Sequence, residues 1–299
     1  MTQNEKSTGF QGCPILGVGL GLRTPLLEKT LQAKQDGLLD WVEFTPENYM
    51  GAQSAEALDE LKQAQVLYPL ISHGVSMSIG STDPFNEDYL SDLEELFDWV
   101  NPPWFSDHLC FSSVNGIYFH DLMPLPRTQE AIEHLAARVA FLKARFNRPI
   151  LLENASYYMT YPQDELSDAA FFSQVVEAAD CGMLLDVNNV FVNSINHHFD
   201  PKAYIAELPL ERVVQIHVAG HHEYPEGLVD THGNTIKDEV WDLLEWTLER
   251  CRPCGAMIER DLYIPEFEEL LPEIQRLREI WDRTQVQTTV LPQKQAALV

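Results

Sequence analysis

Basic residues are scarce in this chain, and their scarcity excludes a class of partners. The sequence has 20 Lys+Arg against 46 Asp+Glu, which gives a formal net charge of −26. A surface of that sign repels a phosphate backbone, so we expect no nucleic-acid partner. The acidity is compatible both with plain solubility and with attraction of a basic peptide or protein.

Long apolar runs and paired cysteine motifs are also missing. No apolar stretch reaches the roughly 20 residues of a membrane-spanning helix, and the polar segment Met1–Phe10 lacks the apolar core of a signal peptide. The five cysteines are an odd, scattered set, and only Cys251 and Cys254 have CxxC spacing, with no second pair. We therefore expect a cytoplasmic protein without a membrane partner and without a structural zinc site.

What the sequence does contain is an alternation of short apolar runs with amphipathic stretches. Strand followed by helix eight times predicts an α/β fold, the (β/α)8 TIM barrel. We expect a single domain over residues 1–283 and a flexible polar tail over 284–299. The predicted strands are Leu16–Leu20, Trp41–Phe44, Leu70–His73, Trp104–Cys110, Pro149–Glu153, Met183–Val187, Val213–Val218 and Ala256–Glu259. The helical candidates include Ser54–Leu67, Glu87–Val100, Gln129–Arg145, Glu165–Ala179 and Lys237–Arg250.

Most of these strands carry an ionisable side chain at or near their carboxyl end. A strand buried on both faces has no structural use for such an ending. In a closed parallel barrel the carboxyl ends meet at one mouth, where barrel enzymes place their chemistry. The residues concerned are His73, His108, Glu153, Asp186, His217 and Glu259.

Several carboxylates at one mouth need compensating cations. Asp230 and His232 stand two apart on an extended segment and so project to the same side, adding to the set. Arg23 and Arg260 are the obvious nearby bases, too few to balance Glu153, Asp186, Asp230 and Glu259. Two or three divalent ions resolve this, with imidazoles as neutral donors. Ligands of oxygen and nitrogen leave catalytic zinc, manganese or iron open, with iron or manganese the better fit.

Asparagines and glycines near the strand ends have less specific meanings. Asn154, Asn188 and Asn189 each follow a strand-end acid, where they orient the ligands, and Asn189 is itself a weak candidate ligand. Glu47 and Asn48 follow the second strand, where a helix start and a substrate contact are equally good interpretations. The run from Gly17 to Gly21 is not the GxGxxG of dinucleotide sites and indicates close packing instead.

The order of these motifs resembles the DUF692 family, the multinuclear non-haem iron-dependent oxidases, which include a methanobactin biosynthesis protein. The resemblance runs from about Leu16 to Leu270 and implies a barrel of the xylose-isomerase-like and endonuclease-four type. It is carried by Gly19-Leu-Gly21-Leu-Arg23, Glu47-Asn48-Tyr49-Met50, His73-Gly-Val-Ser-Met-Ser-Ile-Gly80, Ser106-Asp107-His108-Leu109, Glu153-Asn154, Asp186-Val-Asn-Asn189, His217-Val-Ala-Gly220-His221, Asp230-Thr-His232 and Glu259-Arg-Asp261.

The resemblance also implies a set of metal ligands for two or three iron ions. The first ion would be held by His73, His108 and Glu153. Glu153 would bridge to a second ion, held also by Asp186, His217 and Glu259. Asn189, Asp230 and His232 would hold a third, less fully occupied ion. Residues implied around these ligands or at the substrate are Arg23, Glu47, Asn48, Asp107, Asn154 and His221.

The activity that the resemblance implies is oxidation of a peptide. Members of the family modify residues, chiefly cysteine, in ribosomally made precursor peptides. They use O2 as co-substrate and a mixed Fe(II)/Fe(III) cluster, and many act with a small partner protein that recognises the leader of the peptide. We expect the same of this chain.

Two other functions are compatible with the residues. A divalent-metal hydrolase or isomerase of the same barrel type would share most of the ligands, although the net charge disfavours a nuclease and no strand ends on the lysine that a sugar isomerase would want. A non-catalytic metal-binding protein would need no open coordination positions. Metal analysis combined with an O2-consumption assay separates the three.

Overall fold

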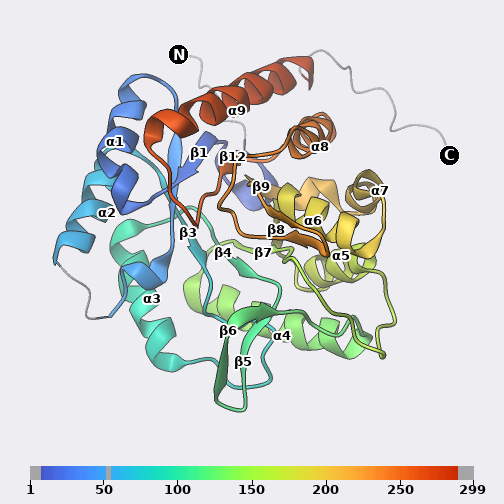
Figure 1. Cartoon of the computed structure of the whole chain (residues 1–299). Helices are drawn as coiled ribbons and strands as arrows, with labels where there is room; N and C mark the ends of the chain where they lie inside the picture. The colour runs from blue at the N-terminus through green and yellow to red at the C-terminus, as the bar shows by residue number, and fades with distance from the viewer. Residues whose placement is uncertain (1–7, 52–54, 289–299) are drawn as a thin grey trace, which may run out of the picture.

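Eight parallel strands close into a barrel that helices surround, in a computed structural model that describes residues 8–51 and 55–288 (Figure 1). This confirms the predicted (β/α)8 barrel. Going around it, each strand pairs in parallel with the next, and the last pairs with the first. The order is β1 (Gly17–Gly21), β2 (Trp41–Phe44), β3 (Leu70–Gly74), β4 (Phe105–His108), β7 (Ile150–Glu153), β8 (Gly182–Asp186), β9 (Val213–Val218) and β12 (Gly255–Ile258).

The helices begin where the sequence supplies a cap. Thr128 accepts a hydrogen bond from the backbone N–H of Ala131, and at the start of the preceding helix Asn86 accepts from the backbone N–H groups of Asp88 and Tyr89. The five predicted helices are present, although Ser54 lies outside the described residues. The helices are α1 (Leu27–Gln35), α2 (Ala55–Leu67), α3 (Glu87–Val100), α4 (Gln129–Phe146), α5 (Asp168–Ala178), α6 (Val187–His197), α7 (Pro201–Ala206), α8 (Asp238–Leu248) and α9 (Phe267–Thr288).

The predicted tail starts too early. Helix α9 continues past Thr284, which is buried and whose hydroxyl donates to the carbonyls of Ile280 and Trp281. Ile280 and Trp281, one turn earlier, are buried as well. Residues 289–299, the rest of the predicted tail, lie outside the described part of the chain. None of the described helices has the length and apolar character needed to cross a bilayer.

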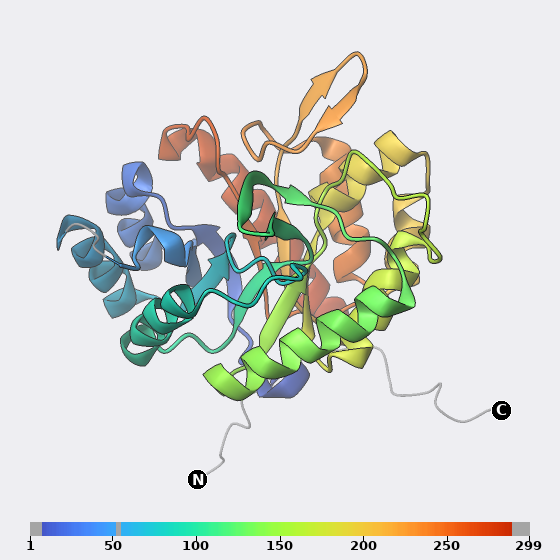
Figure 2. The ribbon, with the colours of Figure 1, turned by 90° about the horizontal axis from the view of Figure 1, so that it is seen from below.

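Two β-hairpins, which are not among the predicted strands, occupy connections between barrel strands and helices. The first, β5 (Phe111–Val114) and β6 (Ile117–Met123), follows β4; the second, β10 (His222–Tyr224) and β11 (Gly227–Val229), follows β9. Both therefore rise from the carboxyl mouth of the barrel, and Figure 2 shows the second one standing out from it. Asn115 and Gly116 turn the first hairpin with φ of 52° and 71°, the left-handed values of a two-residue turn.

The lower half of the barrel interior is apolar. Trp41 lies against the backbones of Gly19 and Gly255, where a Cβ would come within 2.4 Å and 2.8 Å of its indole. Both glycines therefore allow close packing, which was predicted for Gly19. The indole N–H of Trp41 donates to the carbonyl of Gly17, and that of Trp104 to Gln215. The buried side chains of this layer are Cys13, Trp41, Ile71, Trp104, Leu151, Leu184, Val214, Cys254 and Met257.

The upper half is polar because side chains in a strand alternate between its two faces. A side chain two residues after an inward-pointing apolar residue therefore also points inward, one layer closer to the mouth. In five strands that side chain is an acid or a histidine. The steps are Trp41 to Glu43, Ile71 to His73, Leu151 to Glu153, Leu184 to Asp186 and Met257 to Glu259.

Candidate metal centre

Glu153 stands at the centre of the polar layer. Its Oε2 lies 3.0 Å from Nε2 of His73 and 3.2 Å from Nε2 of His108, and its Oε1 lies 3.7 Å from Nδ1 of His217. All four side chains are buried. One carboxylate therefore faces imidazoles from three different strands, an arrangement that suits a bridging ligand.

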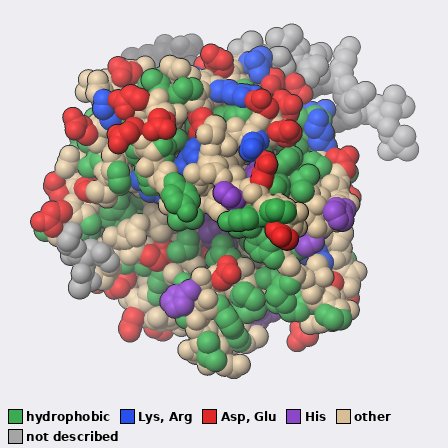
Figure 3. Space-filling model, viewed as in Figure 1, with side chains coloured by type: hydrophobic (Ala, Val, Ile, Leu, Met, Phe, Trp, Pro, Cys, Tyr) green, Lys and Arg blue, Asp and Glu red, His purple; other side chains and the backbone are tan. Residues whose placement is uncertain are grey.

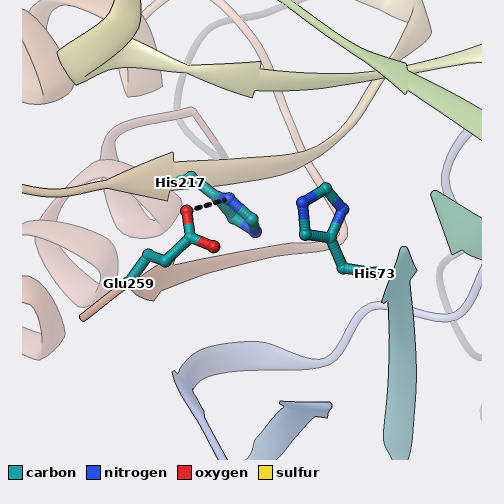
Figure 4. A group of neighbouring side chains, drawn as sticks. All are labelled: His73, His217 and Glu259. Atoms are coloured by element: carbon teal, nitrogen blue, oxygen red, sulfur yellow. Dashed lines mark ion pairs between the residues drawn. The ribbon is translucent and has the colours of Figure 1, made fainter. Parts of the chain in front are cut away.

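A second group surrounds His217. Its Nδ1 lies 2.9 Å from Oε2 of Glu259, and the ring of His73 faces the pair from the end of β3 (Figure 4). Glu153, Asp186, His217 and Glu259 each offer a ligand atom, and these atoms lie within 4.8 Å of one another. His73, His108 and Glu153 form another such group. The structure thus brings together the first two of the three ligand sets that the resemblance implied.

The third group centres on His232. Its Nε2 lies 2.7 Å from Oδ1 of Asp230 and 3.5 Å from Oδ2 of Asp186. Its Nδ1 lies 3.0 Å from Oε2 of Glu259 and 3.2 Å from Oδ2 of Asp261. Asp261, which the sequence reasoning did not select, completes a group with His232 and Glu259. Asn189, the other implied ligand, is buried beside Asp186.

Unpartnered buried atoms test whether this cluster fits metal ions. An isolated buried polar atom costs free energy, so most find a hydrogen-bond partner. In this cluster, nitrogen and oxygen atoms of facing imidazoles and carboxylates lie close to one another without forming hydrogen bonds. Donors bound at about 2.1 Å to one ion stand roughly 3.0–3.5 Å apart, as many of these do. The atoms without a hydrogen bond include His73 Nε2, both Glu153 oxygens, Asp186 Oδ2, Asn189 Oδ1, His217 Nδ1 and His232 Nε2.

The other nitrogen of each of three imidazoles has a partner. His73 Nδ1 lies 2.9 Å from the hydroxyl of Ser106, and His108 Nδ1 lies 3.3 Å from the carbonyl of Gly74. His217 Nε2 lies 3.1 Å from Oε2 of Glu43. Metal-binding histidines usually donate their second N–H in this way, which fixes the tautomer and aims the free nitrogen at the ion. The residues present therefore fit a metal cluster.

Asparagines orient the carboxylates of Asp186 and Asp230 through hydrogen bonds. Asn154 bonds the backbone N–H and C=O of Asp186, each at 2.9 Å, and Asn189 donates from its backbone N–H to Asp186 Oδ1 at 2.8 Å. These bonds leave Asp186 Oδ2 and Asn189 Oδ1 pointing into the cluster. Asn188 donates to Asp230 at 2.9 Å and accepts from His221, which is buried behind it. Asn154, Asn188 and His221 therefore hold ligands and lie outside direct reach of an ion.

Electrostatics across the cluster are strongly coupled. Burial alone would lower the pKa of His73, but the carboxylates of Glu153 and Glu43 raise it to about 10. Burial alone would raise the pKa of Glu153, but the imidazoles of His108 and His73 lower it to about 2. Burial raises the pKa of Asp186 well above its ordinary value. In the metal-free cluster, protons on the imidazoles balance the negative charge of the carboxylates, and bound metal cations would replace those protons.

The remaining implied residues lie at the edge of the cluster. Asp107 accepts from the backbone of His108 and Met77, and burial together with Glu47 raises its pKa well above the ordinary value. Glu47 accepts from Val75, Ser76 and Tyr89 and so anchors the β3 connection. Arg23 forms an ion pair with Asp261. Asn48 is exposed on the short turn after β2.

Three further residues of the site were not selected as site residues from the sequence: Glu43, Asp261 and His120. Glu43 contacts His217 from the interior of a strand, not its last position, and the spacing from Trp41 was the signal for it. Asp261 lies beyond the end of β12. His120 lines the cavity above the cluster.

The cluster forms the floor of an open cavity of about 430 Å³. Figure 3 shows histidines deep in a hollow on the face viewed in Figure 1, with apolar side chains around it. The cavity opens the candidate metal ligands to the barrel mouth. Its walls are Thr45, His73, Val75, His108, Ser112, Tyr118, His120, Asp121, Leu122, Ser156, Asn189, Asp230, Thr231, His232, Glu259 and Asp261.

Known structures share this architecture at low sequence identity. A xylose isomerase domain-containing protein from Salmonella typhimurium matches with a TM-score of 0.54 and 14% identity over 93% of this chain and 98% of that one. A 3-keto-D-glucoside 4-epimerase from E. coli, in its apo form, matches with a TM-score of 0.53 and 14% identity over 88% and 99%. These likenesses support the xylose-isomerase-like fold alone.

Sequence relatives are closer. A UPF0276 protein of Caulobacter vibrioides is 42% identical over 270 residues, covering 90% of this chain and 95% of the relative. A UPF0276 protein of an Anaeromyxobacter species is 42% identical over 266 residues, covering 89% and 93%. The family described as RiPP precursor modification enzyme MbnB/TglH/ChrH, where RiPP denotes a ribosomally made and modified peptide, matches residues 17–282. This chain therefore belongs to that family, as its motifs indicated.

Proposed function

We propose that this protein is a multinuclear non-haem iron-dependent oxidase that uses O2 to modify a residue, chiefly cysteine, of a ribosomally made precursor peptide. The observation that carries the proposal is the set of buried, unpartnered nitrogen and oxygen atoms around Glu153 on the floor of an open cavity. Membership of a RiPP precursor modification family supports the peptide substrate.

The assignment of ions to residues follows the three groups described above. His73, His108 and Glu153 would hold one ion, and Glu153 with Asp186, His217 and Glu259 a second. A third would lie at His232 with Asp230 and Asn189, where Asp261 is a further donor. The mixed imidazole and carboxylate set suits Fe(II) and Fe(III). When bound, iron supplies the redox chemistry with O2 that no side chain of the protein can supply.

The protein's own contribution is positioning. Ser106 and Glu43 fix the ring orientations of His73 and His217, which keeps their free nitrogens aimed at the cluster. The apolar layer below, which includes Trp104, keeps water from reaching the ligands from the bottom of the barrel. Access is therefore limited to the mouth, where a peptide side chain can enter the cavity.

A small partner protein that recognises the peptide leader, and a cytoplasmic location, are part of the proposal. The partner is supported by the family resemblance alone. The location is supported by the five cysteines, all of which are free and buried.

Anaerobic purification with metal analysis and an oxygen electrode tests the proposal. The protein would be mixed with short peptides encoded beside its gene, with and without any small protein encoded there, and the peptide masses followed. We expect two or three irons per chain, O2 uptake that depends on peptide, and a peptide mass change consistent with oxidation.

A matched pair of variants makes that experiment specific. Glu153→Gln should abolish iron binding and O2 uptake, whereas Glu95→Gln, on the exposed face of α3, should change neither. Zinc as the bound metal, with hydrolase or sugar-isomerase activity and no O2 uptake, would contradict the oxidase and favour the alternative of the same barrel type.

A further inference from the structure

Exposed apolar side chains gather at the mouth of the barrel. Among the described residues, 14 large hydrophobic side chains are exposed, and nine of them lie on the hairpins and connections at the carboxyl ends of the strands. Figure 3 shows such side chains around the hollow. Exposed apolar patches of this kind mark binding surfaces. The nine are Ile117, Tyr118, Phe119, Tyr158, Met159, Tyr224, Val229, Leu262 and Tyr263.

Strand β6 borders the metal cavity with its edge. Side chains of a strand alternate between two faces, so a strand that presents one face to a cavity lines it with every second residue. Tyr118 lines the cavity, and so do the three consecutive residues His120, Asp121 and Leu122. Consecutive residues reach the cavity only where the edge of the strand, with its backbone, faces it. The φ of 55° at His120 and the irregular register of the hairpin turn the strand there.

The two edges of this hairpin differ. In a two-residue hairpin the pair that closes the turn, Val114 and Ile117, shares its hydrogen bonds, so the backbones of Ser113 and Tyr118 point outward. Ser78 covers the outward side of Ser113: its hydroxyl accepts from the Ser113 N–H at 3.2 Å and donates to its carbonyl at 3.4 Å. No backbone hydrogen bond reaches Tyr118 from the described residues outside the hairpin. Strand β6 is thus the open edge.

The cavity wall has carboxylates but no lysine or arginine. The carboxylates belong to Asp121, Asp230, Glu259 and Asp261. Asp230, Glu259 and Asp261 lie among the ligand groups, where cations would balance them. Asp121 lies on the exposed part of β6, where its side chain bonds the next backbone N–H and forms no ion pair among the described residues. It leaves a negative charge beside the open edge.

From these observations we propose that β6 is the docking strand for the substrate peptide. An extended segment of the peptide adds to the open edge of β6 through backbone hydrogen bonds, packs apolar side chains against the mouth, and places neutral or basic side chains beside Asp121. This mode of binding, β-strand addition, holds a chain without a fixed sequence and so leaves the target residue free to enter the cavity. The identity of the bound chain as substrate rests on the proposed function.

Synthetic peptides test this docking independently of catalysis. The probe is a fluorescein-labelled 12-residue peptide of alternating Thr and Val, with a serine at the centre so that no thiolate binds metal, and a lysine on either side of it. A second peptide carries glutamates in place of the lysines. A third is the lysine peptide with every second backbone amide N-methylated, which removes strand pairing and keeps the side chains. Binding is read by fluorescence anisotropy on the iron-loaded and the metal-free protein.

The lysine peptide should bind at least about tenfold more tightly than the glutamate peptide at low salt. N-methylation should weaken its binding about tenfold, because two or more hydrogen bonds are lost. Asp121→Lys should weaken it about fivefold, and Glu95→Lys, which makes the same charge change on α3, less than about twofold. Thermal melts of both variants check that the barrel is intact.

Equal affinity of the three peptides, or no binding of the lysine peptide up to millimolar concentration, would overturn the docking proposal. The proposal would also be overturned if a second copy of the chain occupied the β6 edge, which would be seen as a dimer that Asp121→Lys dissociates. Docking that succeeds while O2 uptake and iron are absent would retain this inference and contradict the oxidase, so the two failures are distinguishable.

Discussion

The two halves of the barrel interior are built by the same strands and have opposite character. The lower half, which includes Trp41 and Trp104, fills its space with apolar side chains whose polar atoms are hydrogen-bonded. The upper half, two residues further along, buries carboxylates and imidazoles whose facing atoms have no hydrogen-bond partner. The first arrangement stabilises the barrel, and the second costs stability unless cations bind. Within one strand, the apolar side chain that stabilises the barrel and the polar side chain of the candidate metal centre are thus only two residues apart.

Removing the central carboxylate, Glu153, should have the largest effect on the upper half. Glu153→Gln takes away the charge shared by His73, His108 and His217, so metal bound at these groups should be lost entirely, as measured by metal analysis. The metal-free stability should fall by less than about 2 kcal/mol, because the imidazoles can lose their protons and leave no unpaired charge. Retention of a full metal complement would contradict the bridging role.

Removing the central aromatic residue should have the converse effect in the lower half. Trp104→Ala opens a cavity in a fully buried layer and should destabilise the protein by about 3–5 kcal/mol in urea unfolding. Metal stoichiometry should stay unchanged in the fraction that remains folded. A variant that loses metal without losing stability would show that the two halves are not separate.

The stability of the metal-free protein should depend on pH through the side chains of the upper half. In metal-free protein the pKa of His73 is raised from 6.5 to about 10, so its stabilising contribution is complete below pH 6.5 and is lost as the pH rises through 10. The pKa of Glu153 is lowered from 4.5 to about 2, so its contribution is present above pH 4.5 and is lost as the pH falls through 2.

Melting temperatures of the chelated protein across pH 5–10 measure this dependence. The melting temperature should fall as the pH rises above 6.5. Glu153→Gln should flatten that decline, whereas Trp104→Phe should lower all values equally and keep the slope. A slope unchanged in Glu153→Gln would sink the assignment of the pH dependence to the cluster.

The smallest effect is expected from changing a residue that only orients a candidate metal-binding side chain. Ser106→Ala removes the partner of His73 Nδ1 and should weaken metal binding about 10–100-fold in a chelator competition, with little change in stability. Ser112→Ala, beside the same cavity wall, serves as the matched control and should leave the affinity unchanged. An equal loss in both variants would point to general loosening of the site.

Much of this arrangement was predictable from the chain itself. Apolar runs that end on His73, Glu153 and Asp186 indicated both the parallel barrel and the mouth where these residues meet. Alternation from Trp41 places Glu43 inside the barrel, but its contact with His217 becomes visible only once the strands are placed side by side. The hairpin containing His120 was missed as well, since its exposed, mixed sequence has no buried face and its open edge depends on what Ser78 covers.

Anomalous X-ray diffraction at the iron edge, from crystals of anaerobically prepared protein, tests the central claim most directly. We predict anomalous peaks between His73, His108 and Glu153, between Glu153, Asp186, His217 and Glu259, and a weaker peak at His232. Ordered waters at these positions in protein supplied with iron, with no anomalous signal, would contradict it.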